Sequence, residues 1–325
     1  MEPRPLKKIY DTAQKVTDRM RALAKTNSIE TRFLHQRFAL ERFLKRLSTS
    51  PYREKIVLKG GVVMLTLADD MLRPTEDIDA NIEDLSEQTV RDLVTTVAAV
   101  VPDEEDGLVF RTEELTIKPI MEGGDNGLRA LFWAEYPNEA GRPVRVRMKL
   151  DFAPTNPRNE FRLDSLPSTL KDFSPVAIPM YSWARVFAEK VHTIAKHGMF
   201  NTRAKDFYDL VMLARNGRFD GEVLAGALVE VFDERITPAI TEPLDGLSDE
   251  FAIIQQQIWD NFAADRNGLS VKIGTLLEVI QEIRPFVLPV VTAAATGESF
   301  TKEWSPGNGW QEVTPSLVPR QEFLK

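Results

Sequence analysis

Two aspartates, Asp77 and Asp79, flank Ile78 in the segment DIDANI (77–82), which has the composition of a short β-strand. Because side chains alternate along a strand, we expect both carboxylates on one face and Ile78 on the buried face. Two carboxylates this close repel each other unless a cation lies between them, and magnesium prefers such hard oxygen ligands. The spacing is therefore typical of a metal site, although alone it also fits a solvated acidic face of an edge strand.

A third carboxylate, Asp151, lies on another predicted strand, at 142–154. Apolar residues alternate there with charged ones: Val144, Val146, Met148 and Leu150 with Arg145, Arg147, Lys149 and Asp151. Paired aspartates with a third on a neighbouring strand form the ligand set of two-metal, in-line phosphoryl chemistry. In such a site Asp151 could also accept the proton of an attacking hydroxyl group.

A pair of glycines precedes these carboxylates. Lys59, Gly60 and Gly61 follow a short apolar strand (55–59) and precede an apolar helical run (62–72), which Arg73 and Pro74 would end. Glycine lets the backbone approach a ligand closely, and the first N–H groups of a helix suit a phosphate. No G-x-x-x-x-G-K-[ST] motif occurs in the chain, so this is a phosphate site of another kind or none.

The elements that must position these residues follow an α/β pattern. Helices are predicted over 6–26, 29–47 and 86–102, a hairpin over 108–121, and strands over 127–137 and 142–154. From 179 onward the chain is mostly helical, with helices over 182–198, 203–217, 221–236, 249–266 and 269–287. Residues 296–325 are rich in glycine, proline and tryptophan, which indicates a surface tail.

Composition restricts the location and the chemistry. The 325 residues include no cysteine, which excludes disulfides, zinc-finger motifs and thiol nucleophiles and fits a reducing cytoplasm. The N-terminal residues do not resemble a signal peptide, and no apolar run is long enough to span a bilayer. We therefore expect a cytoplasmic protein with no membrane partner.

The net charge of −8 is unevenly distributed. Residues 1–60 hold 15 Lys and Arg against 6 Asp and Glu, a balance of +9, so the remainder holds 26 against 43, a balance of −17. Such segregation indicates either a polyanion-binding end or a pair of solvated basic helices.

A second group of charges lies in the segment AEKVHTIAKHGMFNTRAKDFYDL (188–210). Taken alone, Glu189 and Lys190 on an amphipathic helix are typical of a solvated pair. Asp206 and Asp209, with Arg203 nearby, fit ordinary charges at the start of a helix. His35 lies on an apolar helix, where packing is the usual role of a histidine.

The segments LKGG (58–61) and RPTEDID (73–79) together resemble the first motif of the nucleotidyltransferase superfamily, in the variant found in AbiEii/AbiGii-type toxin nucleotidyltransferases, to which the mycobacterial MenT toxins are related. The segment 188–210 resembles the later motif of that family. The superfamily usually has Gly-Ser where this chain has Gly60-Gly61, so a phosphate contact normally made by the serine would come from the backbone or from Thr75.

The resemblance implies a role for each matching residue. Lys59, Gly60, Gly61 and Thr75 would bind the nucleotide, and Asp77, Asp79 and Asp151 would hold Mg²⁺. Lys190 would neutralise the triphosphate of the NTP and Asp206 would complete the site, with Asp209 structural. The implied fold is α/β: two basic helices (1–50), a nucleotidyltransferase domain with a mixed sheet (51–178), a helical domain that completes the active site (179–295) and an irregular tail (296–325).

The implied function is that of a toxin in a bacterial toxin–antitoxin or phage-defence system. It would transfer a nucleotidyl group from an NTP to the 3′ end of tRNA, which blocks translation, and a cognate antitoxin would be encoded nearby. Two alternatives stay open: the same fold modifying a protein or a small molecule, and a nucleotide-binding regulator without turnover. The set of Asp77, Asp79, Lys190 and Asp206 argues against the regulator, because paired charges are costly to keep without a function.

Overall fold

A computed structural model describes residues 6–67, 75–120, 127–139, 141–154, 161–235, 244–264 and 273–312. The chain divides into two compact units: Met1–Ser182 with Ala263–Lys272, and Trp183–Phe262 with Ile273–Lys325. The main division thus follows Ser182, a few residues beyond the position 178 expected from the sequence.

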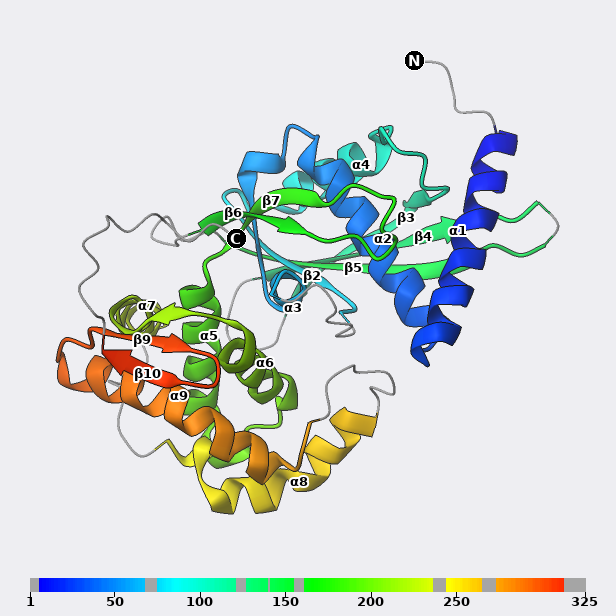
Figure 1. Ribbon diagram of the computed structural model, residues 1–325. Coiled ribbons are helices and arrows are strands. Elements are labelled where there is room, and N and C mark those ends of the chain that lie inside the picture. The colour runs from blue at the N-terminus through cyan, green and yellow to red at the C-terminus, as the bar shows by residue number, and fades with distance from the viewer. Residues whose placement is uncertain are drawn as a thin grey trace, which may run out of the picture. The chain divides into compact units, whose positions relative to one another are not determined.

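The first unit contains a mixed sheet with the strand order β3-β4-β5-β2-β1-β7-β6 (Figure 1). The strands are β1 (Ile56–Lys59), β2 (Ile78–Ile82), β3 (Val109–Ile120), β4 (Gly127–Tyr136), β5 (Val144–Pro154), β6 (Phe161–Leu166) and β7 (Val176–Tyr181). Strand β5 is parallel to β2 and β1 is parallel to β7, whereas the remaining pairs are antiparallel. The predicted mixed sheet is therefore confirmed.

The helices of this unit are α1 (Leu6–Asn27), α2 (Thr31–Ser48), α3 (Gly61–Met64) and α4 (Glu87–Ala99), with a 3₁₀ turn at Arg53–Lys55. Ser86 is the N-cap of helix α4, and its side chain accepts a hydrogen bond from the backbone N–H of Thr89. The continuation of the predicted helix 62–72 and its stop at Arg73 and Pro74 lie outside the described residues.

The two faces of the sheet differ in polarity. Along β5, Val146, Met148 and Leu150 are buried while Arg145 and Arg147 are exposed, as the alternation predicts. Helices α2 and α4 contact strands of the sheet. The ring of Phe43 on α2 lies 5.4 Å from that of Phe110 on β3 and 5.5 Å from that of Phe132 on β4. The opposite face of the central strands carries charged side chains and positions the candidate site.

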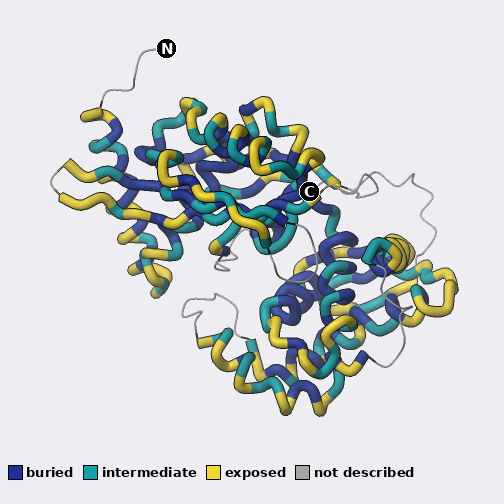
Figure 2. Tube along the Cα trace, turned by 180° about the vertical axis from the view of Figure 1, so that it is seen from behind, coloured by how far each residue is buried: buried dark blue, intermediate teal, exposed yellow. Residues whose placement is uncertain are grey.

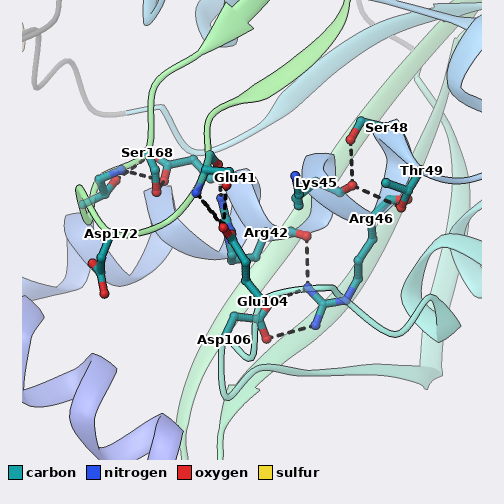
Figure 3. A network of polar contacts seen from close by, with 12 residues as sticks. Glu41, Arg42, Lys45, Arg46, Ser48, Thr49, Glu104, Asp106, Ser168 and Asp172 are labelled. Atoms are coloured by element: carbon teal, nitrogen blue, oxygen red, sulfur yellow. Dashed lines mark hydrogen bonds and ion pairs between the residues drawn. The ribbon is translucent and has the colours of Figure 1, made fainter.

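Helix α2 is not a solvated basic helix. The guanidinium of Arg46 donates to both oxygens of Asp106, at 2.6 and 3.0 Å, and both side chains are buried (Figure 3). Arg42 is buried as well and pairs with Glu104 at 3.1 Å, and Arg37 pairs with Glu41 at 2.8 Å. Three of the 15 basic residues in 1–60 are thus paired within the fold, and the solvated-helix interpretation is wrong for α2.

The second unit is mainly helical. Its elements are α5 (Trp183–His197), α6 (Ala204–Asn216), β8 (Phe219–Asp220), α7 (Gly221–Glu234), α8 (Asp249–Ala264), α9 (Leu276–Thr296), β9 (Lys302–Ser305) and β10 (Gly309–Glu312), with 3₁₀ turns at Gly198–Phe200 and Asp245–Leu247. The helices α5 and α6 are buried along most of their length, as are the inner strands of the sheet in the first unit (Figure 2). The predicted helical second part is confirmed.

Four elements, β3, β6, β7 and α9, differ from the sequence-based expectation. Residues 109–120 form one strand with an irregular register after Arg111, so a hairpin within 108–121 is wrong: β3 pairs instead with β4. The sequence pattern predicts neither β6 nor β7. Helix α9 continues through Pro285 and Pro289 to Thr296, because its buried valines pack in the core of the unit and outweigh the hydrogen bonds that the prolines remove.

The tail is not irregular throughout. Strands β9 and β10 form an antiparallel hairpin, and β9 also pairs with β8. Trp304 is buried, and its indole N–H donates to the carbonyl of Ala214 at 2.8 Å. None of the described helices is long and apolar enough to cross a membrane.

Candidate active site

The charged face of the sheet carries a row of four side chains on four neighbouring strands. Lys59 on β1 is opposite Asp79 on β2, Asp79 is opposite Asp151 on β5, and Asp151 is opposite Arg129 on β4. Directly opposite residues point to the same face of a sheet. Asp77, two residues before Asp79, shares this face by the same alternation.

The structure brings together the three predicted carboxylates. Asp77, Asp79 and Asp151 each offer an oxygen atom, and these atoms lie within 4.8 Å of one another in half-buried positions. We call these three residues the aspartate triad. Strand pairing accounts for the arrangement, because the parallel β2–β5 register places Asp79 beside Asp151.

Two cations on the neighbouring strands β4 and β5 hold the aspartate triad. Arg129 donates to both oxygens of Asp151, at 2.8 Å each, and Lys149 lies 2.8 Å from Asp77 and 3.6 Å from Asp151. Burial lowers the pKa of Lys149, but its hydrogen bond to Asp77 and the charges of Asp77 and Asp151 outweigh burial and raise that pKa above its usual value. The segment GLRALFWAEYP (127–137) predicts a strand, but the partner of Arg129 depends on the register between strands.

The aspartate triad fits a divalent cation. Three carboxylates converge from two strands, and their oxygen atoms are the hard ligands that Mg²⁺ and Mn²⁺ take. The ammonium of Lys149 already lies between two of the three carboxylates, which identifies that place as one of strong negative potential.

Gly60 closes one side of the aspartate triad. Its φ of 65° and ψ of −145° lie in a region that only glycine adopts readily. A Cβ atom at this position would lie 2.2 Å from Oδ2 of Asp79, so the backbone of Gly60 rests directly against that carboxylate. The glycine before the Asp-Ile-Asp pattern is therefore required by the packing of a proposed metal ligand.

The other predicted nucleotide-binding residues flank this point. Lys59 is half-buried and opposite Asp79, and Gly61 opens helix α3, which has only four residues. Thr75 is buried, and its hydroxyl has no hydrogen-bond partner in the described part of the chain. A phosphate contact by Lys59, Gly60, Gly61 or Thr75 stays a prediction.

Arg129 and Lys149, which contact the aspartate triad, also line a pocket of about 440 Å³. Its lining residues are Arg32, Phe33, Gln36, Glu76, Arg129, Leu131, Arg147 and Lys149. We call it the cationic pocket. The predicted basic face of β5 contributes only in part, since Arg145 lies outside the lining and pairs with Glu114 at 2.5 Å and Glu135 at 3.0 Å.

Lys190 and Asp206, also predicted, come together in the second unit. The ammonium of Lys190 lies 3.2 Å from Asp206 and 2.5 Å from Asp209, and Lys190 is only 8% exposed. The solvated-pair interpretation of Lys190 is therefore wrong. Asp209 is fully buried and lies closer to the ammonium of Lys190 than Asp206 does.

The electrostatics of this second cluster are those of a buried ion-pair network. Burial raises the pKa of Asp206, but the charges of Lys190 and Arg203, together with their hydrogen bonds, outweigh burial and lower that pKa below its usual value. The aspartate triad belongs to the first unit and the Lys190 cluster to the second. One active site containing both stays a prediction.

Comparison with protein families agrees with this chemistry. The family described as the nucleotidyl transferase AbiEii toxin of a type IV toxin–antitoxin system matches residues 42–277, which is most of the chain. The chain therefore belongs to the AbiEii nucleotidyltransferase toxin family, and the resemblance seen in the two sequence motifs is confirmed. It is a toxin-type nucleotidyltransferase of a type IV toxin–antitoxin system.

Among solved structures, the chain is similar to MenT4, a nucleotidyltransferase toxin from Mycobacterium tuberculosis H37Rv. The two share 17% sequence identity with a TM-score of 0.47, over 86% of this chain and 99% of MenT4. No curated protein matches the sequence.

Proposed function

We propose that the chain transfers a nucleotidyl group from an NTP to the 3′ end of an RNA, with tRNA as the acceptor, in a reaction that depends on a divalent cation. Loss of functional tRNA would block translation in the cytoplasm, and an antitoxin encoded nearby would restrain the toxin. The convergence of Asp77, Asp79 and Asp151 on one face of the sheet carries this proposal.

In the proposed reaction, Asp77, Asp79 and Asp151 hold the divalent cation. When bound, it would neutralise charge on the phosphates of the NTP and on the leaving pyrophosphate. The attacking hydroxyl forms the new bond to the α-phosphorus while the bond to pyrophosphate breaks. Asp151 accepts the proton of that hydroxyl, and Lys59, the Gly60–Gly61 backbone and Thr75 orient the triphosphate.

Lys190 and Asp206 are proposed to complete the site from the second unit. Their mutual pairing supports this role, because Asp206 and Asp209 fix the position of the Lys190 ammonium. A lysine held in this way can act as a point charge toward a triphosphate.

The acceptor class rests on charge. The protein carries −8 overall, so an RNA needs local positive charge, and Arg32, Arg147 and Lys149 supply it in the cationic pocket beside the aspartate triad. Transfer to a protein side chain or a small molecule is the second candidate. A regulator without turnover is disfavoured, since the converging carboxylates would be destabilising with no metal to bind.

Incubation with NTPs labelled at either the α- or the γ-phosphate, in the presence of total RNA and total protein, tests the proposal. Label from the α-phosphate in RNA, with none from the γ-phosphate, is the expected result, and each of the four bases is compared. Label in protein alone would establish the second candidate. Label from the γ-phosphate would mean phosphoryl rather than nucleotidyl transfer.

A further inference from the structure

The cationic pocket has charged side chains that can bind an anion and apolar side chains that can contact a flat apolar group. Arg32, Arg129, Arg147 and Lys149 face it, and Glu76 is the one acidic residue in its lining. Phe33 and Leu131 supply apolar wall, and the guanidinium of Arg32 lies 4.7 Å from the centre of the Phe33 ring. Its volume of about 440 Å³ is within the usual range for small ligands.

The place of the pocket relative to the aspartate triad follows from the strand order. Strands β1, β2, β5 and β4 are neighbours in that order, and Gly60 follows β1 while Arg129 lies on β4. In the row of residues across these strands, Gly60 lies beyond the β1 end and Arg129, which lines the cationic pocket, lies at the β4 end. In an in-line displacement the attacking and leaving oxygens lie on opposite sides of the phosphorus. With the leaving pyrophosphate on the Gly60 side, the acceptor lies on the pocket side.

The cations of the pocket are not equally available. Arg147 is exposed and makes no ion pair among the described residues. Arg129 and Lys149, by contrast, are held by the carboxylates of the aspartate triad. Their positive charge is balanced by the same oxygen atoms that a divalent cation would take.

Local charge balance makes the consequence definite. Four cations line the pocket, and a fifth, Lys59, lies opposite Asp79 in the aspartate triad. They face five carboxylates in the pocket, in the triad or paired with them: Glu30, Glu76, Asp77, Asp79 and Asp151. These charges balance, so a single divalent cation in the aspartate triad leaves an excess of two positive charges. Anion binding in the pocket and metal binding at the aspartate triad are then mutually reinforcing.

We propose that the cationic pocket is the subsite for a phosphodiester group of the single-stranded acceptor, and that Lys149 and Arg129 are internal counter-ions that become available to this phosphate when a divalent cation occupies the aspartate triad. The inference rests on the proposed function, which it deepens by giving the acceptor strand a place and an order of binding. The affinity of the pocket for nucleic acid is then low while the aspartate triad holds no divalent cation, and high once the cation is bound.

Binding measurements without turnover test the coupling. The probe is a single-stranded trinucleotide RNA blocked at its 3′ end, and free Mn²⁺ is followed by electron paramagnetic resonance, with a titration lacking protein as reference. Mn²⁺ should tighten trinucleotide binding by about 5- to 150-fold, and the trinucleotide should tighten Mn²⁺ binding by the same factor. Equal affinities with and without Mn²⁺ would overturn the proposal.

Three glutamine variants separate the roles of the cations. Lys149→Gln should bind Mn²⁺ more tightly than the unmodified protein when no RNA is present, because the competing internal cation is gone, and should lose most of the coupling. Arg147→Gln should leave Mn²⁺ binding alone and weaken the trinucleotide about tenfold. Arg145→Gln is the matched control on the same strand face: its partners Glu114 and Glu135 lie outside the pocket, so neither affinity should change.

The opposite direction of the Lys149 effect is the decisive feature. If Lys149→Gln weakens Mn²⁺ binding or leaves it unchanged, Lys149 supports the aspartate triad and is not its counter-ion. Arg129→Gln, expected to behave as Lys149→Gln does, decides the question if the lysine variant fails to fold, as judged by its circular dichroism spectrum.

A second ligand identifies the source of the phosphate. An α,β-methylene NTP replaces the trinucleotide, and its binding should be unaffected by Arg147→Gln. If that variant weakens the NTP analogue and spares the trinucleotide, the pocket binds the donor and the acceptor assignment is wrong. Failure of the proposed function is a different result: no label would reach RNA in the transfer assay, whatever the coupling between Mn²⁺ and the trinucleotide.

Discussion

Gly60→Ala tests how the backbone of β1 positions the proposed metal ligand Asp79. The native conformation at Gly60, with φ of 65° and ψ of −145°, costs an alanine about 1–3 kcal/mol. The added Cβ would also lie 2.2 Å from Oδ2 of Asp79, whereas ordinary contacts begin at 3.4 Å, so the carboxylate must move by about 1.2 Å or the backbone must shift.

A displacement of that size is large compared with the tolerance of a metal site, in which ligand distances are set to within about 0.2 Å. We therefore expect two effects: the free energy of unfolding of Gly60→Ala falls by about 1–3 kcal/mol, and its affinity for Mn²⁺ falls at least about tenfold. Urea denaturation measures the first effect and isothermal titration calorimetry with Mn²⁺ the second.

Gly226→Ala is the matched control. Gly226 lies on the exposed face of α7, and an added Cβ would meet nothing within 4 Å, so this variant should gain about 0.5–1 kcal/mol with Mn²⁺ affinity unchanged. A double-mutant cycle isolates the mechanism: in an Asp79→Ala background, Gly60→Ala should cost no further Mn²⁺ affinity. Gly60→Ala with the Mn²⁺ affinity of the unmodified protein would refute the reasoning.

Three further predictions concern buried charges and the acceptor. Lys190→Ala leaves two buried aspartates without their cation, so it should lower the free energy of unfolding by about 3–5 kcal/mol and abolish transfer. Lys190→Arg should recover stability better than the rate of transfer. A denaturation curve showing unaltered stability for Lys190→Ala would contradict the pairing. Burial, aided by the charge of Arg21, lowers the pKa of His35 from 6.5 to about 4, so the ring stays neutral in the native state. The free energy of unfolding should therefore fall by roughly 3 kcal/mol as pH falls from 6.5 to 4. His35→Phe should flatten that part of a stability–pH profile, and an identical profile would oppose the assignment. The rate of RNA labelling should fall steeply as the salt concentration rises. Changing Lys7, Lys8 and Lys15 to Glu should make this salt dependence less steep without affecting NTP binding, as labelling reactions at rising salt would show. Arg19 is left unchanged because it pairs with Asp172.

Features that depend on neighbours in sequence could be predicted. The alternation over 142–154 correctly separated the buried and exposed residues of β5, and Ser86 marked the start of α4. The pairing of Asp77 with Asp79 followed from the two-residue period of a strand. In each case the cause acts within one element.

Features that depend on strand register or on packing between distant segments could not be predicted from the sequence. Arg129 meets Asp151 across 22 residues, Arg46 meets Asp106 across 60, and Lys149 meets Asp77 across 72. Each pair exists only once the order and register of the strands are set, and a one-dimensional pattern does not contain that order.

The missed strands have a related explanation. β6 is an edge strand whose Phe161 and Leu163 are exposed, so its apolar residues do not mark a buried face. β7 contains Pro179, which normally argues against a strand, yet this residue pairs with Leu163 in the β6–β7 ladder. Local rules fail where an edge or a proline is accommodated by the partner strand.

The most direct test of the account is the rate at which Asp79→Asn transfers label from an α-labelled NTP to RNA, measured beside the unmodified protein. The amide would keep the size of the side chain and remove the charge that holds the cation, so we predict a loss of at least about a hundredfold with the fold unchanged by circular dichroism. Asp92→Asn, an exposed change on α4, should leave the rate unaltered. Transfer by Asp79→Asn at the rate of the unmodified protein would contradict a catalytic aspartate triad.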